Sequence, residues 1–159
     1  MKKALKMKLR GLTKPQFARL KELTQHSKNL YNQTLWTLRE AYEVTGFYYN
    51  YFQMDKAMKQ VPNLEDKINY RLLKAQVARG TLKRVDQNFK SFFQAHRDFQ
   101  KHPDKYKGKP HPPQFKCQPQ DNFVYTYVGF WIKEDRITLE RGLKIKLPKP
   151  LVGKVIKKI

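Results

Sequence analysis

The sequence predicts an α+β protein in which a helical subdomain, residues 13–102, is inserted in a small antiparallel β module. Two patterns predict this arrangement. Apolar residues recur every three or four positions through most of residues 13–102, as in helices, whereas apolar and basic residues alternate near both ends of the chain. A proline-rich segment at 103–119 separates the two patterns. We therefore expect a β module that is split in sequence, with its first strand in residues 1–12 and the remainder in residues 120–159.

The N-terminal segment is the first expected strand. Its apolar and basic side chains alternate: Leu5, Met7 and Leu9 against Lys6, Lys8 and Arg10. Because a strand directs successive side chains to opposite faces, the three basic groups share one face, where they can follow a phosphate backbone. A solvated strand face without a partner is the alternative interpretation.

A long helix is expected next, beginning at Thr13. Thr13 followed by Gln16 is a capping-box pattern, and Pro15 falls in the first turn, where its missing N–H does no harm. Leucine and tyrosine residues then recur at helical spacing as far as Gly46, which can adopt the left-handed conformation that ends many helices. The expected helix has roughly 30 residues.

Further helical segments are expected after a tyrosine-rich turn. They are a short helix over residues 53–60, a stretch over residues 67–79, and a stretch that resumes after Gly80 and ends near Lys101. Val61-Pro62-Asn63 breaks the first of them. We assign Phe89, Phe92 and Phe93 to the core because their spacing fits the apolar stripe of the last stretch.

Residues 103–119 contain more than half of the nine prolines, so they cannot be helical, and we expect an extended basic connector. Three segments beyond the connector predict strands, because they are rich in aromatic and β-branched residues or alternate strictly: residues 122–132, 136–139 and 143–147. Glu134 and Asp135 suit a turn better than a metal site.

The charge of the chain indicates its class of partner. Lys and Arg number 34 against 13 Asp and Glu, giving a formal net charge of +21 on 159 residues, and 13% of the residues are aromatic. So large a charge repels itself in a compact protein, and a polyanion such as nucleic acid neutralises it. No apolar run approaches the ~20 residues that cross a bilayer, so we expect no membrane association. With Cys117 as the one cysteine there is no disulfide within the chain, which fits a reducing cytoplasm.

The pattern of titratable residues does not indicate an enzyme. Most of the carboxylates stand singly among cations, the four histidines have no cysteine partners, and the glycines form no phosphate-binding loop. We therefore expect no catalytic residue, no metal and no cofactor in this chain.

Three groups of side chains are candidates for nucleic-acid binding. The first is the basic strand face already described. The second is the polar side of the helical stretches, whose amide and guanidinium groups can read base edges: Lys74, Gln76, Arg79, Lys83, Arg84 and Lys90. The third is the aromatic turn, whose rings can stack on bases: Tyr48, Tyr49, Tyr51 and Phe52. The connector adds Lys107 and Lys116. A solvated helix face and rings that close the helical core are the alternatives for the second and third groups.

Several stretches together resemble one protein family. They are Leu30-Tyr31-Asn32, Gln76-Val77-Ala78, the segment Leu82-Lys83-Arg84-Val85-Asp86-Gln87-Asn88-Phe89-Lys90-Ser91-Phe92-Phe93, Pro113-Gln114-Phe115-Lys116 and Ile145-Lys146-Leu147-Pro148-Lys149. In this order they resemble the N-terminal half of the TnpB (OrfB) proteins of insertion sequences, which are relatives of type V CRISPR nucleases. The resemblance extends over nearly the whole chain.

The resemblance implies an RNA-guided DNA endonuclease whose wedge-like β module and helical recognition domain, a helix-turn-helix-like bundle, grip guide RNA and target DNA. It places Gln76 and Arg79 nearest to the short duplex motif beside the target. Cleavage in the family resides in a RuvC-like domain that would follow Ile159, so we expect no nuclease activity from this chain alone. The expected partners are guide RNA, double-stranded DNA, and a C-terminal RuvC-like half or the transposase of the element. The expected location is the cytoplasm of a prokaryote, at the nucleoid when bound to DNA.

Two alternatives remain open. One is a stand-alone helix-turn-helix-like repressor or accessory factor of a mobile element, which would bind a specific duplex without RNA and would be expected to form a dimer. The other is a piece of a split or truncated nuclease or transposase.

Overall fold

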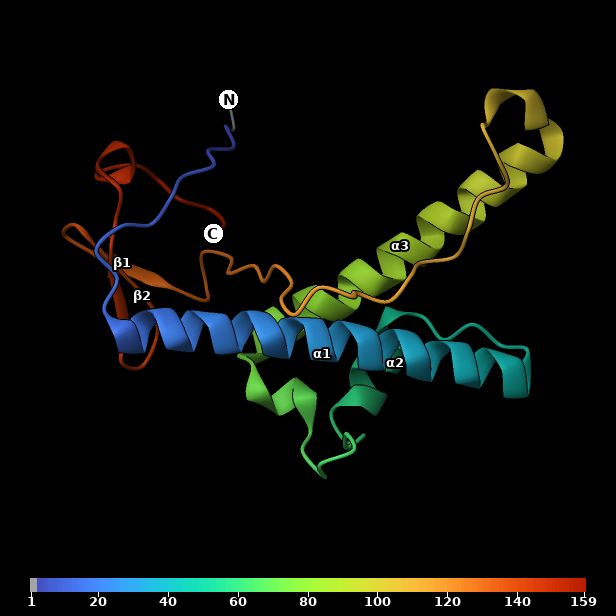
Figure 1. Ribbon diagram of the computed structural model, residues 1–159, viewed down its shortest axis with the longest axis horizontal. Helices are drawn as coiled ribbons and strands as arrows, with labels where there is room; N and C mark the ends of the chain where they lie inside the picture. Colours follow the sequence, from blue (N-terminus) through green and yellow to red (C-terminus); the bar gives the residue numbers. More distant parts are fainter. Residues whose placement is uncertain (1–2) are drawn as a thin grey trace.

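The computed structural model describes residues 3–159, and its mixed helix and sheet content confirms the α+β class. The helices are α1 (Lys14–Thr45), α2 (Tyr51–Met58) and α3 (Ala75–Lys101), and the strands are β1 (Trp131–Lys133), β2 (Arg136–Glu140) and β3 (Leu143–Lys146). Single turns of 3-10 helix occur at η1 (Asn69–Leu72), η2 (Pro103–Lys105) and η3 (Lys149–Leu151). Figure 1 shows the sheet beside the first turns of α1, while the far end of α3 projects away from it.

Helix α1 begins and ends as the sequence predicts. The Thr13 hydroxyl accepts a hydrogen bond from the Gln16 backbone N–H at 3.3 Å, and the Gln16 amide oxygen accepts one from the Thr13 backbone N–H at 3.0 Å. At the other end Gly46 has a φ of 69°, the left-handed conformation that a residue with a Cβ rarely adopts. The capping box, Pro15 in the first turn and the glycine cap are all confirmed.

Replacing Thr13 by Ala is expected to lower the free energy of unfolding by about 1 kcal/mol, because it removes the acceptor for an otherwise unpaired N–H of the first turn. Urea denaturation followed by circular dichroism measures the change. The matched control is Lys14→Ala, an exposed neighbour outside the capping box, with an expected change within about 0.5 kcal/mol. Equal effects of the two substitutions would show that the cap contributes nothing.

The region between α1 and α3 differs from the prediction. Helix α2 starts at Tyr51 because Asn50 caps it, accepting hydrogen bonds from the backbone N–H groups of Phe52 and Gln53. The expected helix over residues 67–79 is wrong, since only η1 and the start of α3 are helical there. Residues 59–74 separate α2 from α3, far more than the three or four residues of a helix-turn-helix connection, so these helices do not form that motif.

Helix α3 runs without a break through Gly80, where an interruption was predicted. A Cβ built on Gly80 would meet open space, so this glycine lies on the outer side of the helix. Its intrinsic cost to a helix, about 1 kcal/mol, is smaller than the stabilisation from the apolar stripe on the inner side. The inner side buries seven residues, of which all but Thr81 and Asp86 are apolar: Val77, Ala78, Thr81, Leu82, Val85, Asp86 and Phe89.

The buried apolar residues form one cluster that spans both parts of the chain. Helix α3 packs against α1 and α2, and the cluster continues into the strands through Tyr125, Ile137 and Ile145. Phe89 is buried, and Phe92 and Phe93 pack partly buried against the cluster, which confirms their assignment to the core. An ion pair between Arg19 and Glu140, 2.5 Å from Nε to Oε1, joins α1 to β2.

The sheet is antiparallel in the order β1-β2-β3. Trp131 pairs with Thr138, and Ile137 pairs with Ile145, with an irregularity between Thr138 and Glu140. The turn predicted at Glu134 and Asp135 is confirmed, and Glu134 adopts a φ of 56° there. The strands predicted at 136–139 and 143–147 are confirmed as β2 and β3, the latter ending at Lys146.

Two strand predictions fail. Residues 3–12 pair with no other segment, and Leu5 and Leu9 are largely exposed, because an alternating pattern gives a strand only where a neighbouring strand completes the hydrogen bonds. Residues 1 and 2 of the predicted strand lie outside the described residues. Within residues 122–132 only the last two belong to a strand, β1. Thr126 forms an isolated antiparallel bridge with Lys158 instead.

The connector leaves α3 at its far end and returns along it, as Figure 1 shows. Apart from the single turn η2 it has no helix or strand, as predicted. No helix within residues 3–159 is both long enough and apolar enough to span a bilayer.

Candidate nucleic-acid interface

The outer side of α3 carries a continuous row of basic and amide side chains, which we call the α3 basic face. Its members follow one another at intervals of three or four residues, so they share one side of the helix, and all are exposed: Arg79, Lys83, Gln87, Lys90, Gln94, Arg97 and Lys101. At 1.5 Å per residue the row is about 33 Å long, enough to pass several phosphates. No carboxylate is a member of the row, but Asp86 and Asp98 border it, each three or four residues from two of its members.

The nearby carboxylates leave this face accessible. Lys90 Nζ lies 2.6 Å from an Asp86 carboxylate oxygen, yet the Lys90 side chain remains 67% exposed. Arg79 Nε lies 3.9 Å from Asp55, at the limit of an ion pair, and its side chain is 52% exposed. The Asp86 and Asp55 side chains are only 11% and 15% exposed, but both cations face solvent, where phosphate can reach them.

Lys83 adds an aromatic contact to the face. Its Nζ lies 5.1 Å from the ring centroid of Tyr51, within the range of a cation–π interaction. Burial, and then the charge of Asp55, raise the pKa of the Tyr51 hydroxyl, so this ring stays neutral. Burial acts to raise the pKa of Asp55, but hydrogen bonds from Lys59 and Tyr70 outweigh it, and the net shift is downward. Tyr51, which the sequence analysis names as a candidate for stacking on bases, therefore lies directly beside the α3 basic face.

Lys74 and Gln76, predicted on the open polar side, are engaged inside the protein. Lys74 Nζ donates hydrogen bonds to the carbonyl oxygens of Gly129, at 3.0 Å, and Leu139, at 2.5 Å. The Gln76 amide donates to the Thr126 hydroxyl and accepts from the Thr126 backbone N–H at 3.4 Å. Both side chains join the start of α3 to residues 126–139 and so have a role within the fold, while their contact with nucleic acid stays a prediction.

Arg84 and Lys116 are also drawn inward. Arg84 donates to the Asn122 carbonyl oxygen at 3.0 Å and to the Asp121 carboxylate at 2.7 Å. Lys116 Nζ lies 3.9 Å from Asp121 and 5.1 Å from the Tyr31 ring centroid, with the side chain 39% exposed. Arg84 is thus a structural tether, whereas Lys116 remains partly exposed beside Asp121.

The remaining predicted cations are exposed but do not share one face. Lys6, Lys8 and Arg10 lie in the unpaired N-terminal segment, so the common strand face expected for them is absent. Lys107 is exposed at the start of the connector. These four supply positive charge without the fixed spacing that α3 gives its own cations.

The aromatic turn divides between core and surface. Tyr48 packs against Phe89 and Phe93 and donates to Asp86 at 3.1 Å, and burial raises the pKa of its hydroxyl well above the usual value. The Phe52 side chain, in contrast, is 78% exposed. The alternative of rings closing the core is confirmed for Tyr48, while Phe52 presents a ring to solvent.

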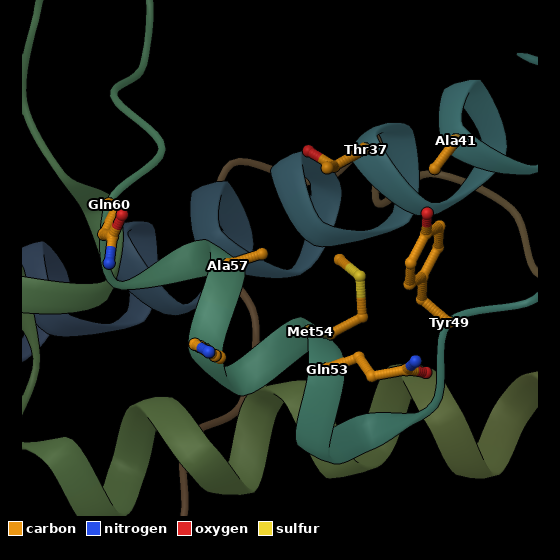
Figure 2. A pocket seen from close by; sticks show the side chains of 8 residues that line it. Thr37, Ala41, Tyr49, Gln53, Met54, Ala57 and Gln60 are labelled. Carbon is orange, nitrogen blue, oxygen red and sulfur yellow. The ribbon is translucent and has the colours of Figure 1, made fainter.

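Figure 2 shows a groove of about 450 Å³ between α1 and α2, beside this turn. Tyr49 and Met54 point toward α1, where Thr37 and Ala41 line the opposite side. Lys56 is the one charged residue among the lining residues described. The groove therefore offers mainly apolar and amide contacts, with Tyr49 and Lys56 as the titratable groups among its lining residues.

The carboxylates do not converge. Among residues 3–159, no three histidine, cysteine, aspartate or glutamate side chains are grouped to hold a metal ion. Those with close partners face cations or tyrosines instead, as Asp55, Asp86, Asp121 and Glu140 do.

Four members of the α3 basic face were missed from the sequence: Gln87, Gln94, Arg97 and Lys101. The signal was present, because the helical period continues unbroken from Arg79 to Lys101. All four lie in the stretch that was predicted to follow Gly80, at helical spacing from Lys83 and Lys90.

Comparison with known proteins gives no family assignment, since neither a family model nor a curated protein matches this chain.

Proposed function

We propose that this chain binds nucleic acid through the α3 basic face. The observation that carries the proposal is the row of five cations and two glutamines, all of them exposed along one side of a single helix. A rigid row fixes the spacing of the charges, and phosphate contacts of this kind position a nucleic acid irrespective of its sequence. The net charge of +21 extends the attraction over the rest of the molecule.

We further propose that the nucleic acids are guide RNA and target DNA, and that the chain acts as the N-terminal half of a TnpB-like RNA-guided nuclease. The support is the similarity of Leu82–Phe93 and Pro113–Lys116 to that family. The first of these segments lies on α3 and includes part of the α3 basic face. Cleavage would then require a RuvC-like half outside this chain.

The electrostatic part of the proposal is tested by salt. A plot of log affinity against log salt concentration is expected to have a slope of about −3, because each phosphate of a single strand that one of the five cations neutralises releases about 0.7 counterion. Between about 50 and 200 mM salt, affinity for a single-stranded oligonucleotide should then fall roughly sixtyfold. Fluorescence anisotropy with a labelled strand measures this change.

A flat response to salt would contradict binding through the α3 basic face. Binding measured on different strand types separates the TnpB-like role from the repressor. If the chain forms a dimer and prefers one duplex sequence in the absence of RNA, the repressor interpretation is favoured.

A further inference from the structure

A second site lies where the connector returns past α1 and α3. It is a cleft of about 570 Å³, which we call the connector cleft. Its lining includes Tyr31, Asn88, Ser91, Phe92, Phe115 and Lys116. The volume lies in the range of small-ligand sites, roughly 300–1,000 Å³.

The connector wall of the cleft is fixed to α1. The Asn32 side chain donates to the Lys116 carbonyl oxygen at 3.0 Å and accepts from the Lys116 backbone N–H at 2.8 Å. Arg39 donates to the Pro113 carbonyl oxygen, and its guanidinium lies 4.9 Å from the Phe115 ring centroid. These contacts hold Phe115 in place although the connector there has neither helix nor strand.

The lining combines rings with a few polar groups. Phe115 is 40% exposed, so part of its ring is open for stacking. Asn88 uses its amide nitrogen to donate to the Tyr31 hydroxyl at 2.9 Å, which orients its carbonyl oxygen as an acceptor. The Ser91 hydroxyl adds a donor and acceptor. Aromatic faces with an amide and a hydroxyl are what a nucleobase requires, because it has a flat π surface and polar edges.

The cleft also borders the α3 basic face. Ser91 lies four residues after Gln87 and three before Gln94, so it adjoins that face on the helix surface. Lys116 lines the other wall, and its side chain is 39% exposed although its ammonium lies 3.9 Å from the Asp121 carboxylate. A strand held by its phosphates along α3 would thus pass the cleft with cations on both sides.

We propose that the connector cleft receives one unstacked base of a single-stranded nucleic acid, with its ring on Phe115, its polar edge toward Asn88 and Ser91, and the adjoining phosphate near Lys116. This inference rests on the proposed function, since the strand reaches the cleft through the α3 basic face. It adds a base-dependent contact to binding that otherwise depends on phosphate.

The test compares the full chain with its Phe115→Ala variant on two strands of about 12 nucleotides, one natural and one with every base removed. Loss of one base–aromatic stack is expected to lower affinity for the natural strand roughly tenfold. Affinity for the abasic strand should stay within about twofold, because its phosphate contacts are unchanged. Phe115→Tyr keeps the stacking surface and should bind both strands like the original chain. Ribose and deoxyribose versions of the natural strand show which nucleic acid supplies the base.

The exposed ring of Phe17, on the first turn of α1, provides the matched control, since Phe17→Ala should leave both affinities unchanged. Equal losses on natural and abasic strands in Phe115→Ala would overturn the proposal, as would no loss on either. If the original chain binds neither strand, the proposed function itself fails, and this outcome is distinct from the first two.

Discussion

Reversing three charges on the α3 basic face, by Lys83→Glu, Lys90→Glu and Arg97→Glu together, is expected to lower affinity for a single-stranded oligonucleotide about a thousandfold. In water, a unit charge at ~4 Å from a phosphate gains about 1 kcal/mol, and a reversed charge loses as much again. Three reversals would total about 6 kcal/mol without salt, and screening at physiological ionic strength reduces this to about 4 kcal/mol. Fluorescence anisotropy at fixed salt measures the loss.

A matched control separates position from net charge. Lys21→Glu, Lys56→Glu and Lys67→Glu change the formal charge by the same amount, and all three residues are exposed and lie outside α3. We expect this variant to lose about tenfold, through the long-range field alone. Circular dichroism and urea denaturation confirm that both variants fold. Similar losses in the two triple variants would mean that the chain attracts nucleic acid diffusely and that α3 has no special part.

Local signals predicted much of the fold. The capping box at Thr13, the glycine cap at Gly46 and the strict alternation at 143–147 each lie within a few residues of the structure they specify. The physics of these features is local, because caps and pleats depend on near neighbours. Accordingly α1, β2 and β3 match the prediction closely.

Features that depend on distant partners were not predictable. The alternation of residues 3–12 resembles a strand, but whether a neighbouring strand completes it depends on the rest of the fold. Lys74, Gln76 and Arg84 have the composition of a binding face, yet their partners come from residues 121–139. Nothing in the sequence around these three residues marks the pairing.

The α3 basic face was predictable from the sequence only in part. Its period was readable from sequence, but the extension of the row from Lys83 back to Arg79 required that Gly80 stay helical. The apolar stripe on the opposite side of α3 makes it so, because burial of that stripe against α1 outweighs the low helix propensity of one glycine. Tertiary packing thus determines the length of the candidate interface.

Comparison of Lys74 with Lys83 distinguishes a lysine that stabilises the fold from one that binds nucleic acid. Replacing Lys74 by Ala is expected to lower the free energy of unfolding by about 3 kcal/mol, since two hydrogen bonds from a charged donor are lost and the carbonyl groups of Gly129 and Leu139 are left without it. Urea denaturation measures the change. Lys83→Ala, on the exposed face, should alter stability by no more than about 0.5 kcal/mol.

Oligonucleotide binding, measured under conditions where both variants remain folded, should be affected by Lys83→Ala and not by Lys74→Ala. Lys83→Ala should reduce the magnitude of the salt slope by about one, because one phosphate contact is lost. Lys74→Ala should leave the slope unchanged, since its ammonium is committed to the carbonyl groups beside the sheet and releases no counterion from the strand. A slope reduced by Lys74→Ala, with stability unaltered, would show that this ammonium contacts phosphate and would return Lys74 to the binding face that the sequence predicted.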